Sequence, residues 1–268
     1  MIVDGPELAL LAGTLRRTMA TTSGPALDRA LYRLGWPDML VEIPEIAVPL
    51  VFRLLGETGA QASVLNDVVR HAAGAPLPGE AVPLPFAGGS WVVWERDVET
   101  VSTTTFSVVD RELPLRRTGT GEQPPLAAGR RALGWWLIGA GRAMLALARQ
   151  HALDRKQFGR PLASFQAVRH RLAETLVALE GAEATMHTAG DEFGAMLAKA
   201  AAGQAASTAA RHCQQVLGGI GFTDEHDLHR HIRRVLVLDG LLGSSRELTR
   251  QAGASIRTRG SAPRLAQL

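Results

Sequence analysis

Apolar residues recur at helical spacing in three stretches of the first 71 residues. The first, ELALLAGTLRRTMA, opens at Pro6-Glu7, and Thr22-Ser23-Gly24-Pro25 separates it from ALDRALYRLGW. The third, IPEIAVPLVFRLLGETGAQASVLNDVVRHA, has the pattern of one or two further helices. Proline suits the first turn of a helix, and apolar residues three or four apart share one helix face. The pattern therefore predicts a helical region over residues 1–71.

The pattern changes between residues 72 and 121. Pro76, Pro78, Pro83 and Pro85 exclude a regular helix there. The stretch WVVWERDVETVSTTTFSVVDRELPL instead holds β-branched and aromatic residues in short alternating runs, which are typical of strands. We expect two to four strands in this small β region.

Helical periodicity returns after residues 118–125, which we interpret as a linker, and continues almost to the C-terminus. Small residues such as Gly139 and Gly141 in the first of these helices would let neighbouring helices approach closely. Ser244 followed by Glu247 fits a capping box for the last helix. Long helices joined by short turns indicate an antiparallel bundle. The expected helices are 126–157, 164–188, 191–217, 226–240 and 244–258, followed by a frayed tail.

Composition narrows the class of protein. The 268 residues are 46% hydrophobic, which is enough for one large or two modest domains. The most apolar stretch, 132–141, is far shorter than the roughly 20 residues that span a bilayer, and the N-terminus lacks the basic segment of a signal peptide. The net charge is only +3 and the basic residues are dispersed, so neither a membrane nor a nucleic acid is an expected partner. The single cysteine, Cys213, predicts a packed thiol and suits the reducing cytoplasm.

Candidate chemistry concentrates in residues 151–174, HALDRKQFGRPLASFQAVRHRLAE. One helix is expected to stop near Gly159-Arg160-Pro161, and the next to restart with Ser164 as its N-cap. Arg155 and Lys156 then lie beside the unpaired backbone donors of a helix start, a suitable seat for a phosphate group. An ordinary helix–helix turn with solvated arginines is the other interpretation.

The segment 155–174 resembles the RxxFGxxxxxxQ signature of the acyl-CoA dehydrogenase family. QVLGGIGFTDEHDLHRHIRR at 215–234 resembles the QxxGGxG signature of the same family. The two signatures occur in the same order and about as far apart in sequence as they do in the family. The resemblance runs from Leu126 to the C-terminal region. It implies a mainly α fold with a small β region: a reduced N-terminal helical part, a shortened β-domain and a C-terminal antiparallel bundle. The corresponding domains are 1–71, 72–121 and 122–268.

In that family FAD lies across a subunit interface. The flavin ring rests in the β-domain of one chain, and the bundle of its neighbour holds the pyrophosphate and the adenine end. Guanidinium groups suit phosphate, and glycine lets the backbone approach a ligand closely. The resemblance implies this cofactor-binding role for Arg155, Phe158, Gln166, Gln215, Gly218 and Gly219.

Three features of the family are missing from the sequence. The β region is about half the family size, and no Thr-Glu-Pro…Gly-Ser-Asp segment, which hydrogen-bonds the flavin ring in the family, occurs. The two family positions of the catalytic glutamate carry Leu242 and Gly129, which cannot accept a proton. The nearest carboxylates in sequence are Glu122, in the linker, and Glu247, explained as a cap. We therefore expect no catalytic base in this chain.

The losses and the retained cofactor residues together predict a shortened partner subunit of a heteromeric α2β2 acyl-CoA dehydrogenase, similar to those of actinobacterial steroid degradation. Its partners would be a longer acyl-CoA dehydrogenase chain, an acyl-CoA substrate with steroid-CoA as the leading candidate, and an electron-transfer acceptor. A structural or regulatory protein without flavin and a self-sufficient homodimer are the alternatives. We interpret His226, His229 and His231 as structural, because no cysteine or carboxylate set completes a metal site.

Overall fold

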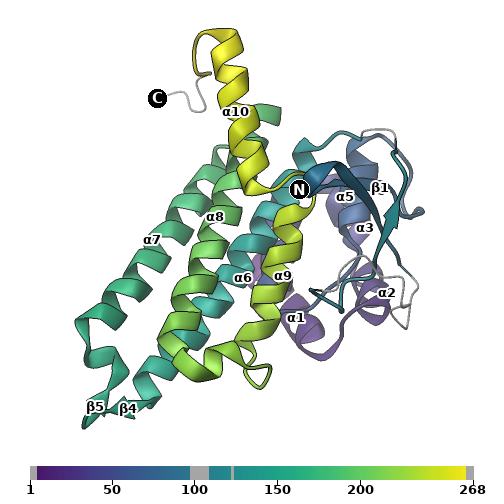
Figure 1. Ribbon diagram of the computed structural model, residues 1–268. Helices are drawn as coiled ribbons and strands as arrows, with labels where there is room; N and C mark the ends of the chain where they lie inside the picture. Colours follow the sequence, from purple (N-terminus) through teal and green to yellow (C-terminus); the bar gives the residue numbers. More distant parts are fainter. Residues whose placement is uncertain (1–4, 97–108, 122–123, 264–268) are drawn as a thin grey trace.

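The chain before the small sheet is helical, as its periodicity predicts. In the computed structural model, which describes residues 5–96, 109–121 and 124–263, this region forms five helices (Figure 1). Proline occupies the first turn of four of them, where its missing N–H loses no partner. The stretch expected to give one or two helices gives two. The five are α1 (Gly5–Thr21), α2 (Pro25–Arg33), α3 (Trp36–Glu42), α4 (Pro44–Thr58) and α5 (Leu65–Ala72).

A small antiparallel sheet follows. Within the described residues it contains β1 (Pro83–Phe86), β2 (Ser90–Trp94) and β3 (Leu115–Thr118) in that order, with a 3₁₀ turn, η1 (Ala87–Gly89), between the first two. Leu84 lies opposite Val92, and both side chains are fully buried. The expected range of two to four strands includes these three, and the part of the predicted strand region at 97–108 lies outside the described residues.

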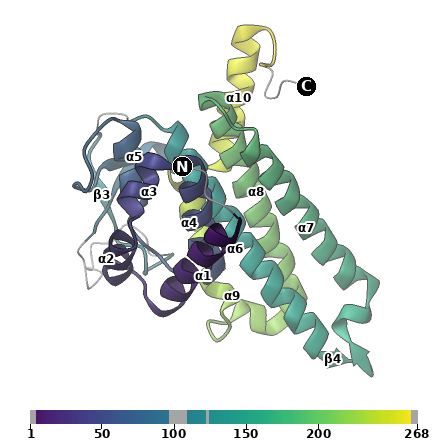
Figure 2. The same cartoon turned by 180° about the vertical axis from the view of Figure 1, so that it is seen from behind.

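Everything from residue 127 onward is dominated by long helices. Figures 1 and 2 show α6, α7 and α8 beside one another, with α7 antiparallel to both α6 and α8, with α9 against α6 and α8, and with α10 extending beyond them. None of the helices in the described part of the chain has the length and apolar character needed to cross a membrane. The elements are α6 (Ala127–Asp154), β4 (Lys156–Gln157), β5 (Arg160–Pro161), η2 (Leu162–Ser164), α7 (Gln166–His187), α8 (Glu192–Leu217), η3 (Gly218–Phe222), α9 (Leu228–Gly240) and α10 (Ser245–Arg259).

Glycine lets α4 and α6 cross in close contact. A Cβ added at Gly139 would overlap the backbone of Arg53, and one added at Gly56 would lie 2.5 Å from the backbone nitrogen of Ala140. The small residues of α6 therefore serve the role that the sequence predicts. The close crossing fixes the N-terminal helices against the bundle.

Two helix starts test the capping predictions. The capping box of α10 is confirmed, because the Ser244 side chain accepts from the Glu247 backbone N–H while the Glu247 carboxylate accepts from the Ser244 N–H. The prediction that Ser164 caps α7 is wrong. Ser164 belongs to η2 and donates its hydroxyl to the carbonyl of Pro161 at 2.7 Å, and Phe165 occupies the N-cap position without a side-chain cap. The hairpin formed by β4 and β5 uses the residues that the sequence assigned to a simple turn.

One buried arginine joins three parts of the fold. Arg234 of α9 is 1% exposed and donates Nε to Asp110 at 2.5 Å, just before β3. Its Nη1 also donates to the carbonyls of Gly59 and Ala60, after α4. Burial of a charge is tolerated when it is paired and hydrogen-bonded. Arg234 therefore packs inside the fold and joins α9 to the segments after α4 and before β3.

Candidate functional site

The hairpin at the end of the bundle carries the residues of the first signature. β4 and β5 pair antiparallel, with Gln157 opposite Arg160, and Phe158 and Gly159 form the two-residue turn between them. Both turn residues have positive φ, 52° and 76°, which two-residue hairpins of this twist require. Glycine adopts such a conformation freely, but a bulky aromatic residue does so only with strain. The Phe158 ring is nevertheless 90% exposed, so it gains almost nothing from packing within the chain.

An aromatic and cationic cluster supports this turn. The Phe165 ring lies 6.2 Å from the Phe158 ring at 78°, an edge-to-face arrangement. The Arg160 guanidinium carbon lies 4.2 Å from the centre of the same Phe165 ring, within cation–π distance. Gln166 follows directly as the first residue of α7 and is exposed. Sequence reasoning missed Phe165, although an aromatic residue immediately before the signature glutamine was the available signal.

Arg155 is fixed through its backbone while its side chain stays free. Its N–H donates to the carbonyl of His151, and its own carbonyl accepts from Leu162 N–H at 2.9 Å. The side chain is exposed and, within the described residues, has no carboxylate at ion-pair distance. Lys156 and Arg160 beside it are likewise exposed and unpaired with any described carboxylate. The hairpin therefore presents an uncompensated positive charge that suits an external anion.

The second signature ends α8 at a sharp turn. Gly218 has φ 64° and ψ −137°, which L-residues rarely adopt. A Cβ built at Gly219 would have no heavy atom within 4 Å, so nothing in the described part of the chain explains glycine there. Gln214 turns inward and donates to the carbonyl of Gly221 at 3.1 Å, whereas Gln215 is exposed. Gln215 and the open space at Gly219 are therefore available to something outside the chain.

Both signatures lie at the same end of the bundle. Figure 1 shows the hairpin next to the end of α6 and the turn after α8 at that end. His151 in the last turn of α6 has a lowered pKa because of partial burial and, next, the nearby charge of His226, which follows η3 in the chain. Residues about 60 positions apart in sequence are thus brought into one region, and their assignment to cofactor binding stays a prediction.

The two family positions of the base meet at the opposite end of α6. A Cβ built at Gly129 would lie 2.7 Å from Leu242 Cδ1 and 3.1 Å from Val69 Cγ2. Leu242 is 1% exposed and adopts φ 57°, and its N–H donates to the carbonyl of Pro85 at 2.8 Å. Arg130 Nε donates to the Leu242 carbonyl at 3.2 Å. Leu242 therefore fills the space in front of Gly129, and the surroundings hold its backbone there.

A buried lysine donates hydrogen bonds to the backbone of the same turn. Lys199 of α8 is fully buried and donates Nζ to the carbonyls of Asp239 at 2.8 Å and Gly243 at 2.6 Å. Burial lowers the pKa of Lys199 to about 8. The Asp239 carboxylate accepts from the Ser245 N–H and so fixes the start of α10. These hydrogen bonds fix the backbone on both sides of Leu242.

The neighbouring carboxylates are already engaged. Glu247 accepts from the backbone N–H of Gly88 at 2.9 Å and from Ser244, and these bonds lower its pKa. Glu192 forms an ion pair with Arg130. Glu122 lies outside the described residues. Glu247 is therefore a structural carboxylate that links the β region to α10, in agreement with its interpretation as a cap.

The three histidines at 226–231 are engaged separately. His226 Nδ1 accepts from Leu228 N–H at 3.1 Å, and His229 lies 3.0 Å from the Asp224 carboxylate. His231 is 7% exposed, and burial is the main cause that lowers its pKa to about 4. Among the described residues, no set of three metal-binding side chains converges. Cys213 is buried, as predicted, and burial raises its pKa to about 12.

Comparison with known proteins defines the class. Residues 122–256 match the sequence profile of the acyl-CoA dehydrogenase C-terminal domain, which is half of the chain. The chain belongs to the acyl-CoA dehydrogenase family. Acyl-CoA dehydrogenase FadE34 of Mycobacterium tuberculosis is 35% identical over 206 residues, which cover 68% of this chain and 29% of FadE34. Acyl-CoA dehydrogenase IpdE2 of the same organism is 39% identical over 122 residues, which cover 44% of this chain and 38% of IpdE2. The chain thus spans about a third of the length of these relatives.

Solved structures share the fold. The Tcur3481-Tcur3483 steroid ACAD G363A variant matches with a TM-score of 0.74 at 17% identity, covering 96% of this chain and 99% of that chain. The ChsE4-ChsE5 complex from Mycobacterium tuberculosis matches with a TM-score of 0.63 at 18% identity, covering 98% of this chain and 100% of that chain. The expected fold class, mainly α with a small β region and related to the acyl-CoA dehydrogenases, is confirmed.

Proposed function

We propose that this chain is a non-self-sufficient subunit of a heteromeric FAD-dependent acyl-CoA dehydrogenase, which introduces a double bond between the α and β carbons of an acyl-CoA thioester. One observation carries the proposal. The hairpin presents Arg155 and a strained Phe158 to solvent, although Arg155 has no carboxylate partner among the described residues and Phe158 is 90% exposed, with only an edge contact to Phe165. Strain at an exposed position persists where function requires it.

The described residues fit the adenine and pyrophosphate half of FAD. In the proposal Arg155 pairs with a phosphate, Phe158 packs on the adenine end, and the backbone at Gly218 and Gly219 approaches the dinucleotide. The unpaired guanidinium and the open space at Gly219 support these roles. Gln166 and Gln215, both exposed beside these groups, would supply hydrogen bonds. FAD, when bound, supplies the redox chemistry by accepting a hydride.

The catalytic base comes from the partner chain in this proposal. The reaction needs a carboxylate that removes the proton next to the thioester carbonyl. The apolar side chain of Leu242 fills the space in front of Gly129, and the Glu247 carboxylate is engaged in the capping box of α10. These contacts support the inference that this chain does not abstract the proton and that a longer chain provides both the base and the flavin-ring site.

The relatives support a proposal for the partner and substrate classes. Fold neighbours include a steroid acyl-CoA dehydrogenase and the two-component ChsE4-ChsE5 complex. We therefore propose an α2β2 heterotetramer acting in the cytoplasm on a steroid-CoA or a similarly bulky acyl-CoA, with an electron-transfer protein as acceptor. FAD would be shared between the unlike chains.

Co-expression with the longer acyl-CoA dehydrogenase encoded nearest to this chain tests the proposal. Flavin absorbance and subunit stoichiometry should give about one FAD per pair of unlike chains, and this chain alone should carry essentially none. A colourless complex would favour the structural or regulatory alternative. Flavin and activity in the isolated chain would instead identify a self-sufficient dehydrogenase.

Two substitutions in that complex test the site itself. Arg155→Gln should weaken FAD binding about tenfold or more, because a charge-assisted bond is lost, whereas Arg257→Gln on exposed α10 should not. Gly219→Ala should also release FAD while the fold is kept, because the added methyl meets no atom of the described chain. Gly253→Ala, equally uncrowded, is its control. Gly218 is a poorer test because its positive φ strains any L-residue. Unchanged FAD affinity in both Arg155→Gln and Gly219→Ala would contradict the FAD-binding role proposed for this chain.

A further inference from the structure

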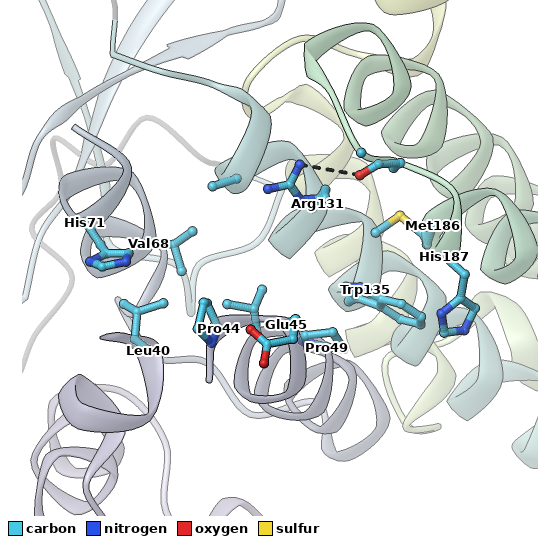
Figure 3. A pocket seen from close by; sticks show the side chains of 14 residues that line it. Leu40, Pro44, Glu45, Pro49, Val68, His71, Arg131, Trp135, Met186 and His187 are labelled. Carbon is cyan, nitrogen blue, oxygen red and sulfur yellow. Dashed lines mark hydrogen bonds between the residues drawn. The ribbon is translucent and has the colours of Figure 1, made fainter. Parts of the chain in front are cut away.

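A cavity of about 430 Å³ lies between the N-terminal helices and the bundle (Figure 3). Leu40, Val48 and Val68 from α3, α4 and α5 line one side. Trp135 of α6 and Met186 of α7 line the other side. The volume lies in the range of small-molecule sites, and the walls are mostly apolar, as in such sites.

Arg131 supplies the cavity with a cation that lacks a counterion. Its side chain, labelled in Figure 3, is half-buried and donates one hydrogen bond, 3.5 Å long, to the carbonyl of Ala189, which also lines the cavity. Within the described part of the chain, no carboxylate lies at ion-pair distance from it, whereas the adjacent Arg130 is paired with Glu192. A guanidinium has five N–H donors, so most of those of Arg131 remain available.

The cavity is separate from the space around the base positions. On an α-helix, Arg131 lies about 200° around the axis from Gly129. Gly129 faces Leu242 and Val69, which are packed, while Arg131 faces the cavity. The cavity is also distant from the hairpin, because it adjoins the first turns of α6 and the hairpin follows the last.

The walls around Arg131 combine an apolar body with a few groups that can bind an anion, Arg131 first among them. His187 lies with its ring 5.2 Å from the Trp135 ring, edge-to-face, and it adds a second group that can donate to an anion. Glu45 in the first turn of α4 lines the cavity too and is exposed. Its charge opposes an anion, so neutralising Glu45 and neutralising Arg131 should act in opposite directions.

We propose that this cavity binds a small amphipathic carboxylate, whose apolar part packs against Val48, Val68 and Met186 and whose carboxylate pairs with Arg131. A planar guanidinium binds carboxylate through two parallel hydrogen bonds, and this pairing is stronger where water is partly excluded. The site is independent of FAD and of any partner chain.

Calorimetric titration of the full chain with decanoate, below its micelle concentration, tests the site. Wild type should bind decanoate and should bind the uncharged decanol at least tenfold more weakly, because the charge-assisted bonds are absent. Arg131→Gln should weaken decanoate binding by about the same factor and leave decanol unchanged. Arg131→Lys should restore part of the loss, since the charge returns without the planar fork.

Two further variants complete the design. Arg149→Gln removes an exposed arginine of the same helix and should change nothing. Glu45→Gln should bind decanoate a few-fold more tightly than wild type, because the opposing charge is removed. Equal binding of decanoate and decanol, or an Arg131→Gln variant that folds as wild type and binds decanoate as wild type does, would overturn the proposal, as would a wild type that does not bind decanoate.

Discussion

The two ends of helix α6 differ in packing: the residues at its start are buried against other segments, and those at its end are exposed. At its start, the Leu242 side chain fills the space in front of Gly129, and Arg130 donates a hydrogen bond to the Leu242 carbonyl. At its end, about 40 Å away along the axis, Arg155 and Phe158 project into solvent. Packing at the start of α6, the closed end, leaves no room for a reacting group. The end of α6, the open end, exposes positive charge and an aromatic ring that make few contacts within the chain. Intrachain stability therefore explains the residues of the first end and not those of the second.

Leu242→Ala should produce the largest change of stability. Removing a buried leucine leaves a cavity beside Gly129 and should lower the free energy of unfolding by about 3 kcal/mol. Urea unfolding at constant pH measures it. Arg155→Gln at the open end is the matched comparison and should change the value by less than about 0.5 kcal/mol. Similar losses for both variants would contradict the contrast between the ends.

The pH dependence of stability should report the buried lysine of the closed end. Lys199 has a folded pKa of about 8 and an ordinary value of 10.5 when unfolded. Between these pH values the unfolded chain binds more protons than the folded chain, so stability rises with pH across this window and levels off below pH 8, where Lys199 is protonated in both states. Relative to Lys199→Met, wild type should gain on the order of 2 kcal/mol from pH 8 to 10.5. A flat difference between wild type and variant across this window would show that Lys199 is not buried as described.

The smallest effect should come from Phe158. Asparagine tolerates positive φ better than phenylalanine does, so Phe158→Asn should relieve strain and raise the free energy of unfolding by at most about 1 kcal/mol. The same variant should lower FAD retention in the assembled complex, because the aromatic surface is gone. Phe158→Leu keeps an apolar but strained residue and serves as control for stability. A clear loss of stability in Phe158→Asn would show that the ring packs within the chain.

Much of the fold follows from local sequence signals. Apolar periodicity predicted the long helices, and the Ser244 and Glu247 pair predicted the start of α10, because a cap acts over three residues. The Ser164 prediction failed for a related reason. Serine can cap a helix only if the chain enters the helix there, and the β4–β5 hairpin instead sends the chain through a 3₁₀ turn to Phe165.

The candidate site was found from sequence only in part. The spacing of the signatures identified Arg155, Phe158 and Gly218. It did not reveal that Phe165 packs against Phe158 and Arg160, or that the backbone of Phe158 is strained. The cavity beside Arg131 gave no sequence signal at all. Its walls come from five helices and one connecting segment, and no fixed spacing relates them.

The sequence by itself determined the long helices, the cap of α10, the family signatures and the identity of the residues at the base positions, because each depends on neighbours along the chain or on fixed spacing. Only the tertiary structure decided that Leu242 occupies the space in front of Gly129, that the exposed charges of the hairpin have no carboxylate partner in the described chain, and that Arg131 faces a cavity. These are properties of volume and proximity between segments far apart in sequence. They follow from how α6 packs against its neighbours, which no local pattern encodes.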